Sequence, residues 1–133
     1  IGALRLDEKV SAPDKLKVHG RLSTHVLDAH SGSPAEGVAL ELVELWGGAS
    51  AQVIARGVTN ADGRTAVPLL DSAVMAPGSF EIIFFVRDYF VCRDVICEFL
   101  DRVQIRFAIT DATASYHVPL LVTPWSYQTY RGS

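Results

Sequence analysis

Two histidines and one arginine are the side chains in this sequence best suited to acid–base chemistry. His25 and His117 each lie in a stretch of alternating aliphatic residues, and each falls opposite the aliphatic row. A strand there would turn its histidine away from the core. Neutral imidazole can remove a proton near pH 7, and a guanidinium such as that of Arg64 can stabilise negative charge on a carbonyl oxygen. The bland alternative is that the histidines are plain surface or interface residues and that Arg64, just after a turn, is only solvated.

The last residues of the chain are unusually rich in contact-making groups. Tyr127, Tyr130 and Arg131 follow the final aliphatic stretch, and the sequence stops two residues later at Gly132-Ser133. Frayed chain ends are usually small and charged. These residues therefore indicate a tail that either covers the end of the fold or belongs to a site.

The positions of apolar residues and turns predict an all-β protein. The predicted strands are residues 20–28, 38–46, 52–59, 64–67, 80–87, 103–110 and 117–122. One or two helical turns are predicted at 70–75, and an irregular connection at 88–101. Short strands with turn signals between them, such as Asn60-Ala61-Asp62-Gly63, indicate a two-sheet sandwich of seven to eight strands with one short helix.

Two of these strands suggest contact with another subunit. Pro119 lacks an amide hydrogen, which confines it to a sheet edge, a strand start or a bulge, and an edge strand could pair with another chain. The strand at 80–87 carries apolar residues on both faces, among them Phe80 and Ile83. Since one face of a sandwich strand meets the core, the other face is expected to be covered by a second copy.

Composition restricts the class of protein. The 133 residues are 49% hydrophobic and 20% charged, which fits one globular domain, here residues 19–133 after a flexible arm at 1–18. A net charge of −3 without a basic stripe makes nucleic acid an unexpected partner. No apolar run reaches the roughly 20 residues of a membrane span. Cys92 and Cys97 match neither a redox pair nor a zinc motif, and they are expected to be buried or half-buried thiols, with a local disulfide only in an oxidising compartment.

Three stretches together resemble the 5-hydroxyisourate hydrolases, the urate-pathway enzymes of the transthyretin-like family. They are the run Ser23-Thr24-His25-Val26-Leu27-Asp28, the turn Asn60-Ala61-Asp62-Gly63-Arg64, and the C-terminal run with His117, Pro119-Leu120-Leu121, Pro124, Tyr127 and Tyr130-Arg131-Gly132-Ser133. Transthyretin is similar in its Leu-Leu, Pro and Tyr pattern but lacks the Tyr-Arg-Gly-Ser ending. The resemblance covers about residues 21–133.

The resemblance implies a transthyretin-like sandwich assembled as a homotetramer, a dimer of dimers, with sites in a channel where dimers meet. It implies catalytic or substrate-contacting roles for His25, Arg64, His117, Tyr130 and Ser133. The implied reaction is hydrolysis of 5-hydroxyisourate to 2-oxo-4-hydroxy-4-carboxy-5-ureidoimidazoline. One histidine would activate water, with His117 favoured, while the other holds substrate and Arg64 stabilises the developing oxyanion.

The residue pattern also leaves other functions open. The runner-up is a non-enzymatic carrier of a small aromatic ligand, as transthyretin is, and a third possibility is a structural sandwich domain. No cofactor is expected. A zinc site could use His25 with His30 or His117, but no third ligand stands at a recognisable spacing. The sequence leaves the compartment open among cytoplasm, periplasm and peroxisome.

Overall fold

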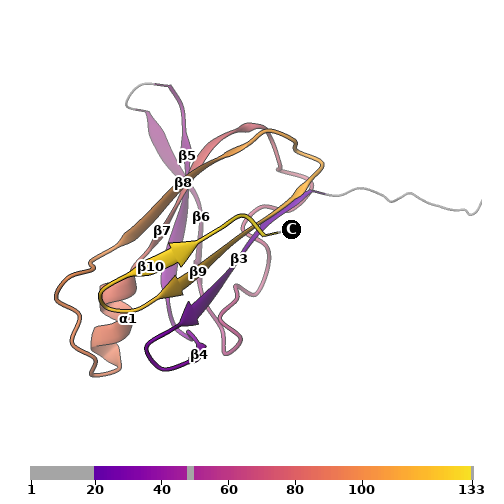
Figure 1. Cartoon of the computed structure of the whole chain (residues 1–133). Coiled ribbons are helices and arrows are strands. Elements are labelled where there is room, and N and C mark those ends of the chain that lie inside the picture. Colours follow the sequence, from indigo (N-terminus) through magenta and orange to yellow (C-terminus); the bar gives the residue numbers. More distant parts are fainter. Residues whose placement is uncertain (1–19, 48–49, 133) are drawn as a thin grey trace, which may run out of the picture.

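A computed structural model describes residues 20–47 and 50–132, so the predicted arm at 1–18 and the terminal Ser133 lie outside the described part. The described chain is built of short strands and one helix (Figure 1). The elements in chain order are β3 (Arg21–Asp28), β4 (Ser33–Pro34), β5 (Ala39–Leu45), β6 (Ala51–Val58), β7 (Gly78–Phe84), α1 (Val86–Cys92), β8 (Val103–Ile109), β9 (Ser115–Val122) and β10 (Tyr127–Thr129).

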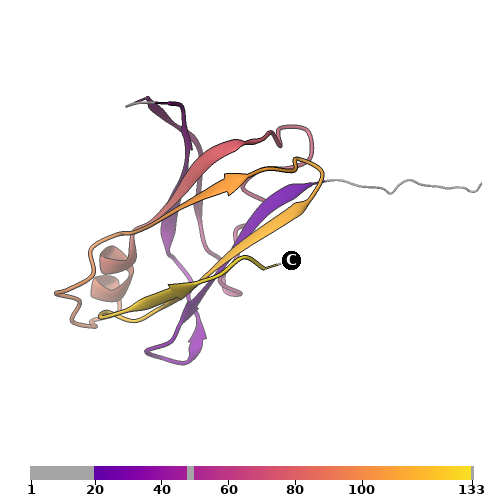
Figure 2. The same ribbon diagram turned by 45° about the horizontal axis from the view of Figure 1, so that its top comes forward.

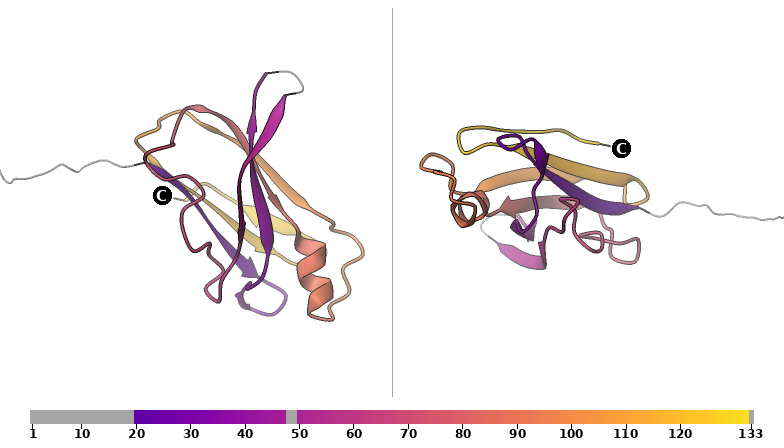
Figure 3. Two further views of the ribbon diagram at one scale, coloured as in Figure 1. Left: turned by 180° about the vertical axis from the view of Figure 1, so that it is seen from behind. Right: turned by 90° about the horizontal axis from the view of Figure 1, so that it is seen from below.

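The strands form two four-stranded sheets that lie face to face, as the right-hand view of Figure 3 shows. One sheet has the order β10-β9-β3-β4 and the other the order β6-β5-β7-β8. Paired strands are antiparallel except β3 and β9, which run parallel with Ser23 opposite His117 and His25 opposite Pro119. The predicted two-sheet sandwich of seven to eight strands with one short helix is confirmed.

Alternation along the strands builds the core. In β3, Leu22, Thr24 and Val26 are buried, while the residues between them are half-buried or exposed on the other face. Each inward row buries apolar surface, and that burial stabilises the fold by roughly 25 cal/mol for each Å² removed from water. The largest fully buried side chains are Phe80, Phe84, Phe90, Leu22, Leu40, Leu42, Ile82, Ile109, Leu120, Val26, Val38 and Val86.

The helix lies elsewhere than predicted. Residues 70–75 form only a turn, in which Asp71 accepts hydrogen bonds from the amides of Ala73, Val74 and Met75. The helix is α1, which begins in the last two residues of the strand predicted at 80–87 and continues into the stretch predicted to be irregular at 88–101. Its buried residues Val86, Tyr89 and Phe90 recur at the three- and four-residue spacing of an amphipathic helix.

Two strand predictions are also wrong. Residues 64–67 form no strand, and β7 ends at Phe84 because the chain turns there into α1. The outward residue of β7, Ile83, is only 9% exposed within one chain. Glu41 and Gln104 flank it in the ladder. A single chain therefore already removes most of the Ile83 side chain from water.

The strand that carries Pro119 is not an edge strand. β9 pairs with β3 on one side and with β10 on the other, so the chain covers its own edge (Figure 2). β10 ends at Thr129, opposite Leu120, one position before it would need the missing amide of Pro119. The Thr129 hydroxyl instead donates to the Pro119 carbonyl at 2.7 Å. Proline here interrupts a ladder rather than ending a sheet.

Both cysteines are free thiols. Cys97 is buried, as expected, but Cys92 is exposed at the end of α1. Burial raises the pKa of the Cys97 thiol. Within the described ranges, no helix is long and apolar enough to cross a membrane.

A buried carboxylate ties α1 to the first sheet. Asp28 accepts the amide hydrogens of His30 and Ser31 on one oxygen and the Tyr89 hydroxyl on the other, at 2.8–2.9 Å. Burial would raise the pKa of Asp28, but these hydrogen bonds outweigh it and lower that pKa below its ordinary 3.8. Burial, with the bond to Asp28 and its charge, raises the pKa of Tyr89 to about 12.

Replacing Asp28 by asparagine is expected to lower the free energy of unfolding at pH 7 by about 1–3 kcal/mol, because buried donors lose their charged acceptor. A depressed folded-state pKa stabilises the fold above the unfolded pKa and loses that effect as the pH falls through the folded value. The gap between wild type and variant should therefore shrink from about pH 5 toward pH 2 in urea unfolding. Glu98→Gln, at an exposed carboxylate, is the control, and a gap that stays constant with pH would contradict the expectation.

Candidate active site

Two histidines meet on the outer face of the sheet that contains β3 and β9. His25 and His117 occupy outward positions on these adjacent parallel strands, and both are half-buried. Ser23 lies opposite His117 in the ladder, and its Oγ is 2.9 Å from His117 Nδ1. The pairing of β3 with β9 thus brings together Ser23 and His117, which are 94 residues apart in the sequence.

The turn at 60–64 docks against β3 beside His25. The Val26 amide donates to the Gly63 carbonyl at 2.8 Å, and the His25 Nε2–H donates to the Asp62 carbonyl at 2.8 Å. Gly63 has a φ of +78°, and a Cβ there would collide with the Val26 carbonyl and press on the His25 ring. The turn therefore needs glycine at this position, and it holds the Nε2 side of His25.

The same turn positions Arg64. The side-chain oxygen of Asn60 accepts hydrogen bonds from the backbone amides of Asp62 and Arg64 at 2.9 and 3.2 Å. The backbone amide of Asn60 donates to the Arg64 carbonyl at 2.8 Å. Arg64 leaves the turn beside a cleft of about 200 Å³. The cleft is lined by Arg21, Ser23, Thr24 and Arg64 together with residues 65–68.

The C-terminal tail returns along β9 to His117. After the interruption at Pro119, the antiparallel register resumes at a bridge between His117 and Gly132. The Gly132 amide donates to the His117 carbonyl at 2.7 Å. A Cβ on Gly132 would come within 2.9 Å of His117 Cδ2 and within 3.3 Å of Cγ. Only glycine lets the tail lie this close to the imidazole.

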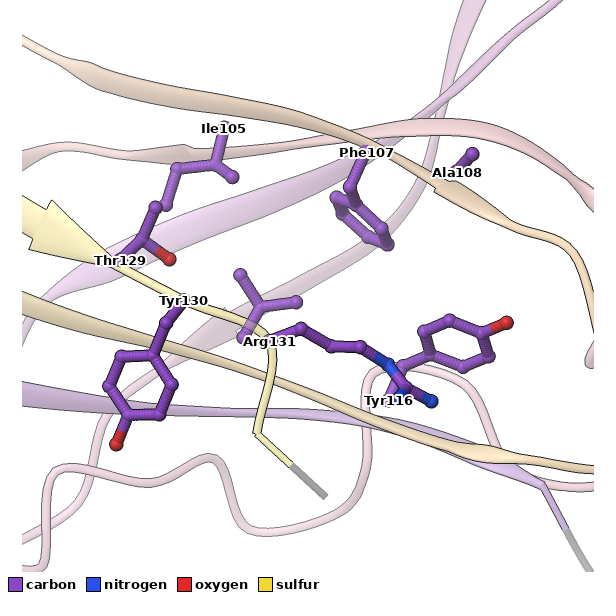
Figure 4. A pocket seen from close by; sticks show the side chains of 8 residues that line it. Ile105, Phe107, Ala108, Tyr116, Thr129, Tyr130 and Arg131 are labelled. Atoms are coloured by element: carbon purple, nitrogen blue, oxygen red, sulfur yellow. The ribbon is translucent and has the colours of Figure 1, made fainter.

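Consecutive tail residues face opposite sides of the sheet. Tyr130 follows the register of Pro119 onto the outer face, is 56% exposed, and points away from Ile105 and Phe107 in Figure 4. Arg131 turns inward, with its guanidinium 4.6 Å from the centre of the Tyr116 ring, and donates to the Ser115 carbonyl at 3.2 Å. An aromatic face and a backbone carbonyl thus hold the Arg131 side chain against β9.

The surroundings of His117 favour its neutral form. Burial is the main cause that lowers the pKa of His117, and the positive charges of Arg64, His25 and Arg21 lower it further. Desolvation and nearby cations both destabilise an imidazolium. His117 is therefore available as a proton acceptor at neutral pH.

The structure brings His25, Arg64 and His117 to one face and places Tyr130 on that face too, while Ser133 lies outside the described residues. Sequence reasoning missed Ser23, although its place two residues before His25 on the same face was a signal. It also missed the Asp62 carbonyl, which no side-chain pattern reveals. No group of three or more His, Cys, Asp or Glu side chains in the described ranges is arranged to hold a metal ion.

Comparison with known proteins gives consistent matches over most of the chain. A 5-hydroxyisourate hydrolase of Deinococcus radiodurans is 45% identical over 117 residues, 86% of this chain and 98% of that protein. The solved structure of the Klebsiella pneumoniae 5-hydroxyisourate hydrolase is 34% identical, with a TM-score of 0.72 over 86% of this chain and 100% of that one.

A longer protein matches as well. The crystal structure of an (S)-allantoin synthase is 39% identical, with a TM-score of 0.82 over 91% of this chain. The chain spans only 46% of the length of that protein. The profile of the HIUase/Transthyretin family matches residues 22–132. This protein therefore belongs to the HIUase/Transthyretin family.

Proposed function

We propose that this protein hydrolyses 5-hydroxyisourate to 2-oxo-4-hydroxy-4-carboxy-5-ureidoimidazoline in urate degradation. The observation that carries the proposal is the convergence of His25, Arg64 and His117 on one sheet face, within the family that contains the 5-hydroxyisourate hydrolases. These residues provide a proton acceptor and a permanent positive charge without a cofactor.

In the proposed mechanism, Nε2 of His117 takes a proton from water as the oxygen attacks the acyl carbon of the ring. The carbonyl oxygen gains negative charge, which the Arg64 guanidinium stabilises. The C–N bond at that carbon then breaks, the nitrogen takes up a proton, and the carbon becomes a carboxyl group. His25 keeps its Nε2–H on the Asp62 carbonyl and holds substrate through its other edge. Tyr130 and Ser133 are proposed to contact the ring.

A ligand carrier of the transthyretin type is the alternative within this family. A carrier surface needs apolar and ion-pairing groups, but it does not need a neutral imidazole beside two guanidiniums. Here burial and the charges of Arg64 and Arg21 lower the pKa of His117, which suits proton transfer. This electrostatic arrangement favours the hydrolase.

The direct test is a kinetic one. Freshly generated 5-hydroxyisourate is mixed with the protein, and its ultraviolet absorbance is followed against the spontaneous decay. We expect a decay rate that rises in proportion to protein concentration. A rate equal to the spontaneous one, with stoichiometric binding of the compound, would favour the carrier.

We also propose a homotetramer, a dimer of dimers, with the site face of the first sheet turned toward a second dimer. An apolar slot of about 270 Å³ opens between the edges of the two sheets, where Ile105 and Phe107 of β8 face Val118 and Thr129 (Figure 4). β8 and β10 are the outermost strands of their sheets at this edge. An apolar slot beside two edge strands is a surface that a second copy would cover.

Sedimentation at micromolar concentration is therefore expected to give a particle of about four times the 14.5 kDa chain mass. Phe107→Glu should shift this particle toward smaller species, because a carboxylate would be buried in the contact. Ile54→Glu, on β6 at the opposite edge, is the matched control and should leave the mass unchanged. A monomeric wild type would remove the shared channel from the mechanism.

A further inference from the structure

We propose that Ser23 is a positioning residue for His117, which holds Nδ1 so that Nε2 is the atom presented to water. The proposal rests on the proposed hydrolase function and adds to it a residue that acts through the histidine rather than on the substrate. Ser23 Oγ lies 2.9 Å from His117 Nδ1, and the two residues are ladder partners on rigid strands.

The imidazole of His117 is held on two sides. Ser23 contacts Nδ1 on one side. On the other side Gly132 lies against Cγ and Cδ2, so closely that a Cβ on this residue would be 2.9 Å from Cδ2. Among residues 20–47 and 50–132, Nε2 of His117 makes no hydrogen bond to the protein. The orientation of the ring is therefore fixed, with Nδ1 hydrogen-bonded to Ser23 and Nε2 available to a water molecule.

The hydroxyl suits a histidine that changes protonation state. For Nε2 to accept a proton, Nδ1 must carry its own hydrogen, and that hydrogen needs an acceptor. Ser23 Oγ can accept it both when the ring is neutral and after it becomes imidazolium. A carboxylate at this place would instead raise the pKa of His117, against the lowering that burial, Arg64, His25 and Arg21 produce.

The test compares Ser23→Ala and Ser23→Thr with wild type. Ser23→Ala should lower kcat by about 10- to 100-fold with KM changed by less than about threefold, because ring orientation is lost while the substrate contacts remain. Ser23→Thr keeps the hydroxyl and should recover most of the rate. Ser33→Ala removes a hydroxyl from β4 of the same sheet, which lies 2.7 Å from the Ser31 hydroxyl, and should leave kcat unchanged.

A second measurement does not depend on turnover. The nitrogen-15 shifts of the His117 ring should report Nδ1–H in wild type and Ser23→Thr, and a changed tautomer ratio in Ser23→Ala. Wild-type kcat in Ser23→Ala, or identical ring shifts in all three proteins, would overturn the proposal. If wild type did not hydrolyse 5-hydroxyisourate, the proposed function would fail, while the ring shifts would still decide whether Ser23 sets the tautomer.

Discussion

Replacing His117 by glutamine is expected to lower kcat by about 10²–10⁴-fold, because the proposed general base is lost while the shape of the side chain is nearly kept. The fold should survive, since the bonds that hold this part of β9 involve the backbone: its ladder with β3 and the Gly132 amide on the His117 carbonyl. The measurement is the initial rate of 5-hydroxyisourate loss in ultraviolet absorbance, with circular dichroism to confirm the sheet content.

His30→Gln is the matched control for this substitution. His30 is exposed in the β3–β4 turn, where its ring stands nearly perpendicular to that of Phe90 with the ring centres 6.4 Å apart, and it takes no part in the proposed site. Its rate should equal that of wild type. A His117→Gln protein that turned over at the wild-type rate would show that the base lies elsewhere, even in an active hydrolase.

The pH profile gives an independent check on His117. A base must be neutral to act, and burial with the charges of Arg64, His25 and Arg21 lowers the pKa of His117 below its ordinary 6.5. The rate should therefore stay high down to pH values below 6.5 and fall only beneath the lowered pKa. Arg21→Gln removes one of these charges, which should raise the pKa of His117 and shift the fall in rate at acid pH to a higher pH.

Deleting residues 130–133 is expected to abolish enzymatic turnover and leave only the spontaneous decay. The deletion removes Gly132 from the His117 ring, Tyr130 from the outer face, and Ser133, which is proposed to contact substrate. Substrate placement of this kind contributes many orders of magnitude to rate, and water cannot replace it. The measurement is the same absorbance assay at high protein concentration.

The sandwich should survive this deletion. The inward row Val118, Leu120 and Val122 stays buried, and β10 keeps its three paired residues. Arg131→Gln is the control for tail anchoring, because it loses the Tyr116 contact but keeps the length of the tail. If the truncated protein kept full activity, the Tyr-Arg-Gly-Ser ending would serve packing rather than catalysis.

Tags at the two ends should differ in effect. A bulky tag directly after Ser133 begins one residue beyond Gly132, which lies against the His117 ring, so activity should fall. An N-terminal tag should be harmless. Equal activity of the two tagged proteins would argue against a role for the chain end.

The sequence alone is enough to assign side chains to faces. Neighbouring residues of a strand point to opposite sides, so the aliphatic rows around His25 and His117 by themselves place both imidazoles outside the core. The turn at 60–64 is equally readable, because Asn and Gly have strong local preferences that do not depend on distant contacts.

Tertiary structure decides which of these faces meet. The pairing of β3 with β9, which sets Ser23 against His117 Nδ1, joins segments 94 residues apart, and no local pattern encodes that register. Pro119 by itself does not distinguish a sheet edge from an interrupted ladder, because its local effect, a missing amide, is the same whether the ladder stops or only skips a position. The tail skips that position and resumes at Gly132, so the strand order around His117 follows only from the folded chain.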